Sequence, residues 1–394
     1  MKRLILAILT VSVPLAGCMN RQESKMIPAN DSCFHIISMN PDDIPSGVQF
    51  FNLSEIADTV EYIPLQTSTE AMVGEVEKMI VHKEKIYIWD QLSESVFCFD
   101  TSGNYLFRIS AHGQGPGEYL RTQDFALNLE NDHICIFSDV DQAILEYDTH
   151  GKFVKEIPST YILQSFALRG NILYEYTGRF ANEYPDTDGK YQFRFNVIKD
   201  GQSISHQLPY IHKEELYEIP MSTHNFTTYK DTLLLSESLS PLIYTVARDG
   251  TLTPRYRIEF TTNKYNPSFE DEHIDIKRMR LEEKEGNLTK LGSALFENDR
   301  YIFFNYTRGL VGTAYVNKRD NSVHNIGFFT MDDYHENPLA LNIRYMDENY
   351  LYIVEEPGAL LMKNSSHPFS ANLKHLLQET DEQSNPVIVR IRLK

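Results

Sequence analysis

The loop from Ser110 to Tyr119 (SAHGQGPGEY) collects residue types that bind ligands: His112, Glu118 and Tyr119, with Arg121 just after them. Its GQGPG core is similar to a phosphate-cradling loop. However, no Lys-Ser/Thr pair follows and the chain continues into a predicted strand, so a phosphate site is excluded. The glycines and the proline favour a tight, irregular path. Two interpretations therefore stay open, a shaped structural loop and a direct ligand role for these side chains.

A larger set of side chains is predicted to frame a binding opening. Its three arginines, on a chain with a formal charge of −18, would bind carboxylate or uronic-acid groups through paired hydrogen bonds. The alternative is that these arginines only form surface ion pairs with Asp139, Glu183 or Glu355. Exposed aromatic side chains could stack on a sugar, and we consider Trp89, Tyr184 and Tyr334 for that role. The predicted binding residues are Trp89, Asp90, His112, Glu118, Tyr119, Arg121, Arg179 and Arg308.

These residues sit in a repeating pattern of short apolar runs. Turn glycines at Gly103, Gly151, Gly201 and Gly250 are 48, 50 and 49 residues apart, which is typical of a propeller or solenoid. β-branched and aromatic runs bounded by Asn, Asp and Gly indicate strands. The second strand of each repeat is predicted at Ile86–Asp90, Ile134–Asp139, Leu173–Tyr176, Leu233–Glu237, Ile302–Asn305 and Leu351–Glu355.

The six repeats predict an all-β, six-bladed propeller with four strands in each blade. The sixth repeat lacks its last strand, since only one run, Val387–Leu393, follows the long insertion after Glu355. An isolated run at Val60–Leu65 resembles the last strands of later repeats. We expect this N-terminal strand to complete the last blade, which closes the ring and removes an exposed sheet edge.

The long insertions lie at residues 176–190, 210–224, 261–292 and 356–386, all after the second or fourth strand of a blade. In a four-stranded antiparallel blade these connections leave from one face, so that face is predicted to bind. Helices are expected near 268–285, with Ser268 as N-cap and Gly286 as stop, and at 370–378.

Polar residues are predicted where the innermost strands begin, at the axis on that face: Glu77, Asp124, Ser165, Asn225, Ser293 and Asn342. Such a ring resembles the divalent-metal centre of six-bladed lactonase-like propellers. That resemblance implies a calcium-like ion held by Glu77, Asp124, Asn225 and Asn342. Polar lining of a wet channel is the alternative. Neither a G-x-S-x-G elbow nor a sialidase-type Asp box occurs, so serine hydrolase and sialidase chemistry are disfavoured.

The N-terminus indicates export. Residues 1–17 carry Lys2, Arg3 and an apolar stretch too short for a membrane span, followed by Leu-Ala-Gly before Cys18. This resembles a lipoprotein signal, which implies a lipidated Cys18 and a membrane contact through the lipid alone. Residues 18–49 are predicted to be a tether and 50–394 the propeller. Loss of the two signal cations takes the charge from −18 to about −20, which excludes nucleic acid as a partner.

Of the remaining cysteines, Cys33, Cys98 and Cys135, the last two lie in apolar strand runs and are predicted to be buried thiols.

The lipoprotein signal, the VEYIPL strand, the GQGPGEY loop and the blade pattern together resemble the six-bladed, NHL-like β-propeller lipoproteins of Bacteroidetes. The resemblance implies an exported lipoprotein with a binding or glycan-related role and assigns no catalytic residues. We expect its lipid anchor to lie in the outer membrane. The residues after Cys18 lack an acidic run, and the orientation, periplasmic or outward-facing, stays open. The leading prediction is a non-catalytic propeller that binds a glycan or peptide without a cofactor. The alternatives are a metal-dependent lactonase- or lyase-like enzyme and a protein-interaction scaffold.

Overall fold

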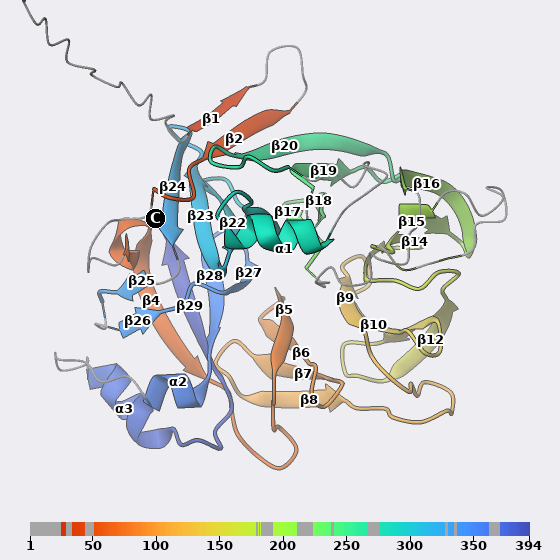
Figure 1. Cartoon of the computed structure of the whole chain (residues 1–394). Coiled ribbons are helices and arrows are strands. Elements are labelled where there is room, and N and C mark those ends of the chain that lie inside the picture. The colour runs from red at the N-terminus through yellow and green to blue at the C-terminus, as the bar shows by residue number, and fades with distance from the viewer. Residues whose placement is uncertain are drawn as a thin grey trace, which may run out of the picture.

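The protein is an all-β propeller whose blades are arranged round an axis (Figure 1). The computed structural model describes residues 25–28, 34–43, 51–178, 180, 182, 192–210, 224–237, 240–266, 276–327, 330–334, 337–361 and 371–394.

Five blades each consist of four consecutive antiparallel strands. The first two are β5 (Val76–His82), β6 (Lys85–Asp90), β7 (Ser95–Asp100) and β8 (Tyr105–Ile109), then β9 (Asp124–Asn128), β10 (His133–Ser138), β11 (Ala143–Tyr147) and β12 (Phe153–Pro158). The third and fourth are β13 (Ser165–Arg169), β14 (Ile172–Tyr176), β15 (Gln192–Lys199) and β16 (Gln202–Tyr210), then β17 (Phe226–Tyr229), β18 (Thr232–Ser236), β19 (Leu242–Val246) and β20 (Leu252–Phe260). The fifth is β21 (Lys290–Glu297), β22 (Tyr301–Arg308), β23 (Leu310–Asn317) and β24 (Ser322–Gly327). All six predicted second strands are strands of the structure, the sixth being β28 of the closing blade.

The predicted closure by the N-terminal strand is confirmed. The closing blade contains β27 (Ile343–Met346), β28 (Tyr350–Glu355) and β29 (Val387–Leu393), and its fourth strand is β4 (Ala57–Pro64). Strand β4 pairs antiparallel with β29 along its whole length, from Val387 opposite Pro64 to Leu393 opposite Ala57. The two ends of the propeller chain therefore lie side by side in one sheet.

The predicted number of blades is wrong, because the structure has seven blades, mostly four-stranded. The additional blade has three short strands, β3 (Phe51–Asn52), β25 (Thr330–Asp332) and β26 (Asn337–Leu339). Strands of two or three residues are too short to show an apolar alternation. In addition, β3 pairs in parallel with β25, which lies far away in the sequence. A count of repeats that are continuous along the chain cannot find such a sheet.

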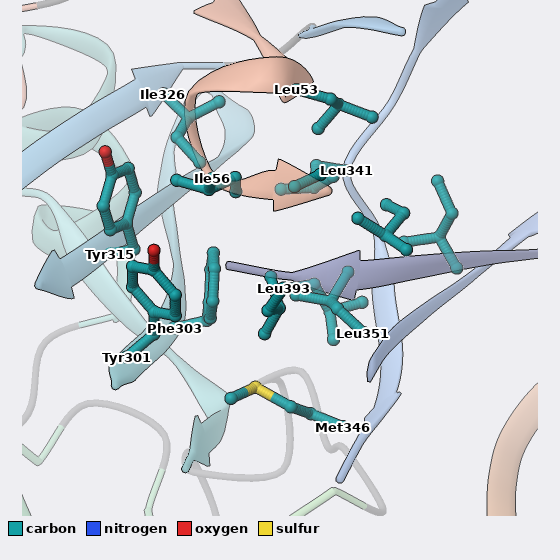
Figure 2. Packing of buried hydrophobic residues seen from close by; sticks show 14 of the residues in the cluster. Leu53, Ile56, Tyr301, Phe303, Tyr315, Ile326, Leu341, Met346, Leu351 and Leu393 are labelled. Carbon is teal, nitrogen blue, oxygen red and sulfur yellow. The ribbon is translucent and has the colours of Figure 1, made fainter. Parts of the chain in front are cut away.

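The additional blade packs on a large apolar cluster that it shares with the β21–β24 blade and the closing blade (Figure 2). Leu53 and Ile56 come from the segment around β3, which includes the short 3-10 helix η1 (Leu53–Glu55). They pack with Phe303 and Tyr315 of the β21–β24 blade and with Leu393 of β29. The rings of Phe51 and Tyr315 meet edge to face at 5.8 Å. Ala57 and Val60 of β4 belong to the same cluster, which therefore helps to hold β4 in place.

Part of the predicted tether forms sheet instead. Strands β1 (Lys25–Pro28) and β2 (His35–Met39) make an antiparallel pair. Strand β2 runs parallel to β20, and β1 pairs with β24 through Lys25 and Ser322. These two strands thus join the outermost strands of two neighbouring blades into one ten-stranded sheet.

The described α-helices lie in the connections of the predicted loop-rich face. Helix α1 (Ile276–Lys284) lies within the range predicted to be helical, and Gly286 follows its end with a left-handed φ of 73°. Helix α2 (Pro357–Leu361) and helix α3 (Ala371–Glu379) both precede β29. Leu373 and Leu376 of α3 pack on Val387. Among the described residues, no helix is long and apolar enough to cross a membrane.

The predicted buried thiols are confirmed at Cys98 and Cys135, which are unpaired and fully buried. Burial raises the pKa of the Cys98 thiol to about 12. Cys18 and Cys33 lie outside the described residues.

The periodic glycines close equivalent turns between the third and fourth strands of four blades. Their φ values are 87° at Gly103, 78° at Gly151, 77° at Gly201 and 86° at Gly250, a region that disfavours side chains. A Cβ at position 103 would lie 2.2 Å from the carbonyl oxygen of Pro64 in β4, whereas at position 201 it would meet nothing within 4 Å. The glycine at 103 therefore also makes room for β4, the N-terminal strand of the closing blade.

We expect Gly201→Ala to lower the free energy of unfolding by about 1 kcal/mol, which is the cost of the left-handed backbone alone. Gly103→Ala should lower it by roughly 2 kcal/mol more, because backbone atoms must move away from the new methyl group. Urea denaturation of both variants measures the difference. Equal losses would show that Gly103 is required only for its φ.

Candidate functional site

The predicted residues at the end of β6 form a structural network around the β6–β7 turn. The Asp90 carboxylate accepts hydrogen bonds from the backbone nitrogens of Gly74 (3.0 Å) and Glu75 (2.8 Å) and from the Ser93 hydroxyl (2.6 Å). His112 Nε2 lies 3.2 Å from the carbonyl oxygen of Ser93. Asp90 is 1% exposed, so its carboxylate oxygens stabilise the local backbone and do not face an opening.

The two large aromatic candidates nearby are buried. Trp89 is 2% exposed, and its indole donates a 3.0 Å hydrogen bond to the hydroxyl of Thr122. Tyr119 is fully buried and donates to the carbonyl oxygen of Glu94 at 2.9 Å. Burial raises the pKa of Tyr119 to about 12. Trp89 therefore has no ring face available for a sugar; Tyr334 is 41% exposed, and Tyr184 lies outside the described residues.

The GQGPG loop is shaped by contacts of its own. Glu118 accepts a 2.8 Å hydrogen bond from the backbone nitrogen of Gly115. A Cβ at Gly117, whose φ is 78°, would lie 2.4 Å from the ring of Phe153. His112 and Glu118 are exposed, but His112 contacts the neighbouring β6–β7 turn and Glu118 contacts the loop itself. Of the two interpretations of the loop, these contacts favour the structural one.

The predicted arginines do not gather at one opening. Arg121 makes a paired interaction with Asp139, the partner that the sequence suggested. Arg308 pairs with Asp42 at 2.7 Å and also donates to the carbonyl oxygen of Gly286. Arg179 lies outside the described residues. The two described arginines belong to different blades and are each already neutralised.

The residues of the predicted metal ring have other partners. Asp124 is fully buried and forms a 2.7 Å ion pair with Lys78. Burial raises the pKa of the Asp124 carboxyl, an effect that Lys78 opposes. The Asn225 amide accepts from Gln164 at 3.2 Å and donates to the carbonyl oxygen of Ser236 at 2.9 Å.

The other ring members are dispersed. Asn342 is exposed, and Glu77 is half-buried with its backbone oxygen accepting from Arg344. Ser165 and Ser293 are buried. In the described part of the chain, no three His, Cys, Asp or Glu side chains lie close enough together to hold a metal ion.

An axial cavity of about 440 Å³ runs between the innermost strands of the six four-stranded blades. Most of its lining is apolar, with aromatic side chains from β13, β17, β21 and β27. Residues of the tight turns between the first and second strands, such as Glu130, Lys230 and Asp231, line one end of the cavity, on the face opposite the insertions. The lining comprises Lys78–His82, Ala126, Leu127, Leu129, Glu130, Phe166–Arg169, His224, Phe226–Thr228, Lys230, Asp231, Leu233, Arg248, Phe296 and Arg344–Met346.

The inner end of the axial cavity carries Lys78, His224 and Arg344. Lys78 is paired with Asp124, and His224 is 9% exposed. Burial, together with Lys78 and Arg344, lowers the pKa of His224 to about 3, so its ring is neutral at neutral pH. Arg344 donates one hydrogen bond, at 3.1 Å to the carbonyl oxygen of Glu77, while its buried Nε has no hydrogen-bond partner among the described residues.

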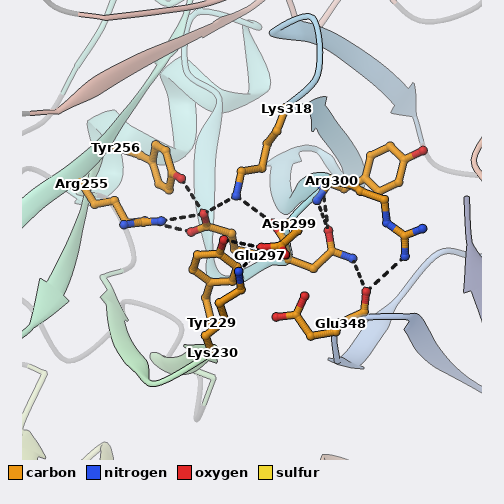
Figure 3. Close-up of polar contacts among 11 residues, drawn as sticks. Tyr229, Lys230, Arg255, Tyr256, Glu297, Asp299, Arg300, Lys318 and Glu348 are labelled. Atoms are coloured by element: carbon orange, nitrogen blue, oxygen red, sulfur yellow. Dashed lines mark hydrogen bonds and ion pairs between the residues drawn. The ribbon is translucent and has the colours of Figure 1, made fainter.

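The turns around the opening of this cavity are held by ion pairs. Arg248 and Glu130 pair at 2.8 Å, and Lys230 pairs with Asp299 at 2.6 Å. Figure 3 shows the adjoining network, in which Glu297 accepts from Arg255, Tyr256 and Lys318. The two ion pairs at the opening each join turns of different blades.

A second, polar pocket of about 590 Å³ lies on the loop-rich face. It is formed by the connection from β18 to β19, by the end of β20 and by the residues that lead into β21. Its lining combines charged, amide and aromatic side chains. The residues are Arg194, Glu237, Ser240, Pro241, Leu242, Tyr244, Arg257–Phe260, Asn263, Asn266 and Leu288–Leu291.

The base of the polar pocket contains a buried ion pair and two unsatisfied oxygens. Arg194 Nε donates to Glu237 Oε2 at 2.6 Å, and the two side chains are 4% and 1% exposed. Among the described residues, neither Glu237 Oε1 nor the Thr289 hydroxyl has a hydrogen-bond partner, and both atoms are buried. A buried polar atom without a partner costs about 1–3 kcal/mol, so such atoms commonly mark a place for water or a ligand.

These two sites were not found from the sequence. The sequence predicts Glu237 only as the end of a strand, and it assigns no role to Lys78. The signal that could have found them is a charged residue at a strand position that must be buried, because buried charges are rare unless paired or functional.

Comparisons with known proteins agree on the fold. A family model described as a domain of unknown function, DUF4934, matches residues 40–392. A Bacteroides fragilis NCTC 9343 protein that is predicted to be exported is 18% identical, with a TM-score of 0.68 over 91% of this chain and 99% of that chain. A member of the DUF4221 family from Bacteroides vulgatus ATCC 8482 is 10% identical, with a TM-score of 0.51 over 86% of this chain and 97% of that chain. No curated protein matches.

At such low identities the two solved structures show a shared fold and no more. The family model, in contrast, spans nearly the whole chain, and the protein is accordingly a member of the DUF4934 family.

Proposed function

We propose that this protein is an exported lipoprotein that binds a neutral glycan, without catalysis, in the polar pocket of its loop-rich face. The observation that carries the proposal is the pair of unsatisfied buried oxygens, Glu237 Oε1 and Thr289 Oγ1, at the base of that pocket. A carboxylate oxygen accepts and a hydroxyl can donate. The two groups therefore complement the hydroxyls of a sugar, each of which is both donor and acceptor.

The charges around the pocket support a neutral ligand. Its cations are all paired: Arg194 with Glu237, Arg257 with Glu259 at 2.9 Å, and Lys290 with Glu283 at 2.7 Å. Charged groups that are already neutralised still offer directional hydrogen bonds but attract no net charge. Tyr244 and Phe260 supply aromatic surface for the apolar face of a sugar ring.

Export and lipidation rest on the N-terminal sequence. Residues 1–17 have the order of a lipoprotein signal and Cys18 stands at its cleavage point, outside the described residues. The similar fold of a Bacteroides fragilis protein that is predicted to be exported supports the same interpretation. A lipid on Cys18 would place the propeller in the cell envelope, where it meets extracellular or periplasmic glycans.

Calorimetric titration with neutral and acidic oligosaccharides tests the proposal. We expect binding of a neutral oligosaccharide, with affinity lowered about tenfold or more in Tyr244→Ala, which corresponds to about 1.4 kcal/mol. Tyr334→Ala is the matched control, because Tyr334 is an exposed aromatic residue that does not line the pocket. Its affinity should equal that of the native protein.

Three results would contradict the proposal. One is preference for uronic-acid oligosaccharides, and another is an equal loss of affinity in both tyrosine variants. The third is the absence of any glycan binding while another protein co-purifies stably, which would favour a scaffold role.

A further inference from the structure

The axial cavity differs in chemistry from the polar pocket and points to a second ligand. Its opening lies among the tight turns of the opposite face, and its inner end carries Lys78, Arg344 and His224. Between these ends the walls are apolar, with Phe166, Phe226 and Phe296 among them. A site with a charged inner end and apolar walls between that end and the opening fits an amphipathic molecule.

The inner end of the cavity has an excess of positive charge. Lys78 and Arg344 are two cations, and Asp124, which pairs with Lys78 at 2.7 Å, is the one carboxylate of the described residues in contact with them. No described carboxylate lies within ion-pair distance of Arg344, and Glu75, Glu77 and Glu356, which act on it from farther away, do not line the cavity. His224 is neutral there, as described above, so it neither cancels nor adds to the charge.

Arg344 is therefore a largely buried cation whose guanidinium is only partly used. It donates one hydrogen bond to a backbone oxygen, and its Nε has no hydrogen-bond partner among the described residues. An arginine in this state presents the planar pair of donors that a carboxylate accepts. Leaving such a group buried and unpaired is costly, which a bound anion would relieve.

We propose that the axial cavity binds a carboxylate attached to an apolar body, with the carboxylate on Arg344 and the body along the aromatic walls. A free aliphatic acid and the carboxyl end of a short apolar peptide share this chemistry. The cavity volume of about 440 Å³ lies within the range of small-molecule pockets, which excludes a folded protein as occupant. This proposal does not depend on glycan binding in the polar pocket.

Titration of the full-length protein with decanoate and with decanol tests the anion requirement, because the two differ only in the head group. We expect decanoate to bind at least tenfold more tightly than decanol, and Arg344→Met to lower the affinity for decanoate to that for decanol.

Acetyl-leucyl-phenylalanine and its amide form a second matched pair. Tighter binding of the peptide acid than of decanoate would assign the site to peptide ends, and the reverse order to free acids.

A variant at the opening separates this site from any other. Thr228 is exposed and lines the cavity, and its side chain makes no hydrogen bond within the described part of the chain, so Thr228→Trp should fold while blocking entry. Decanoate binding should be lost in Thr228→Trp. Equal native affinity for decanoate and decanol, no binding of either, or binding that Thr228→Trp leaves intact would each overturn the proposal.

Discussion

A chain that begins at residue 66, and so lacks β4, is expected not to form a stable propeller. Val60, Ile63 and Leu65 are each less than 8% exposed, and burial of three such side chains contributes about 1.5–3 kcal/mol each. The total of roughly 5–9 kcal/mol is comparable to the whole stability of a typical domain. The loss would also expose β29, whose Ile388, Val389 and Ile391 are fully buried, as an apolar sheet edge.

Size-exclusion chromatography and thermal melting followed by circular dichroism should show aggregates and no cooperative transition for the truncated chain. The matched control returns residues 51–65 to the same chain after Lys394 through a short Gly/Ser linker. This connection is feasible because the backbone nitrogen of Lys394 donates to the carbonyl oxygen of Ile56 at 2.9 Å. The rearranged chain should recover a cooperative melt. If it stays as unstable as the truncated one, the loss comes from β1 and β2 and not from the open ring.

The contribution of Glu175 to the free energy of unfolding is expected to fall as pH rises from about 4.5 to about 8. Glu175 in β14 is fully buried, and its Oε1 accepts one hydrogen bond from Ser159 at 3.0 Å. Its other oxygen has no partner among the described residues. Burial raises the pKa of this carboxyl to about 8, which the Ser159 hydrogen bond opposes.

The folded protein thus keeps a proton that the unfolded chain, with a pKa near 4.5, releases. Folding binds the extra proton between these two pH values, so stability is present in full below pH 4.5 and declines until pH 8. The decline amounts to roughly 3–5 kcal/mol for one group. Above pH 8 the contribution is constant.

Glu175→Gln keeps the shape of the side chain and removes its titration. The difference in free energy of unfolding between this variant and the native protein should move in favour of the variant by a few kcal/mol between pH 5 and pH 8. Urea denaturation at the two pH values measures it, and other titrating groups cancel in the difference. A difference that is the same at both pH values would mean that Glu175 is ionised in the folded protein.

The fold was largely predictable because its turns and strands are local features. The glycines at 103, 151, 201 and 250 have the left-handed backbone that their spacing implied, and the isolated run at 60–65 pairs where an incomplete blade required a strand. The three-stranded blade was not predictable. Its strands have two or three residues each, and the pairing of Phe51 with Thr330 leaves no trace in local sequence.

The candidate sites were less predictable, since they depend on which side chains meet after the blades pack. In a blade covered on both faces, apolar and polar positions do not alternate, so the orientation of Trp89 could not be inferred from its neighbours. Glu237 and Thr289 line one pocket but lie in different blades and share no motif. The pairing of Lys78 with Asp124 likewise required the arrangement of two adjacent blades.

The way β1 and β2 attach to the propeller has a consequence for how the molecule would stand on a surface. They join the chain to β20 and β24, the outermost strands of two blades, and not to either flat side of the disc (Figure 1). If the residues before β1 hold the molecule to a membrane, the rim of the propeller near β20 and β24 would face that membrane. Both flat sides would then face along the membrane plane, where soluble compounds could reach either one from solution.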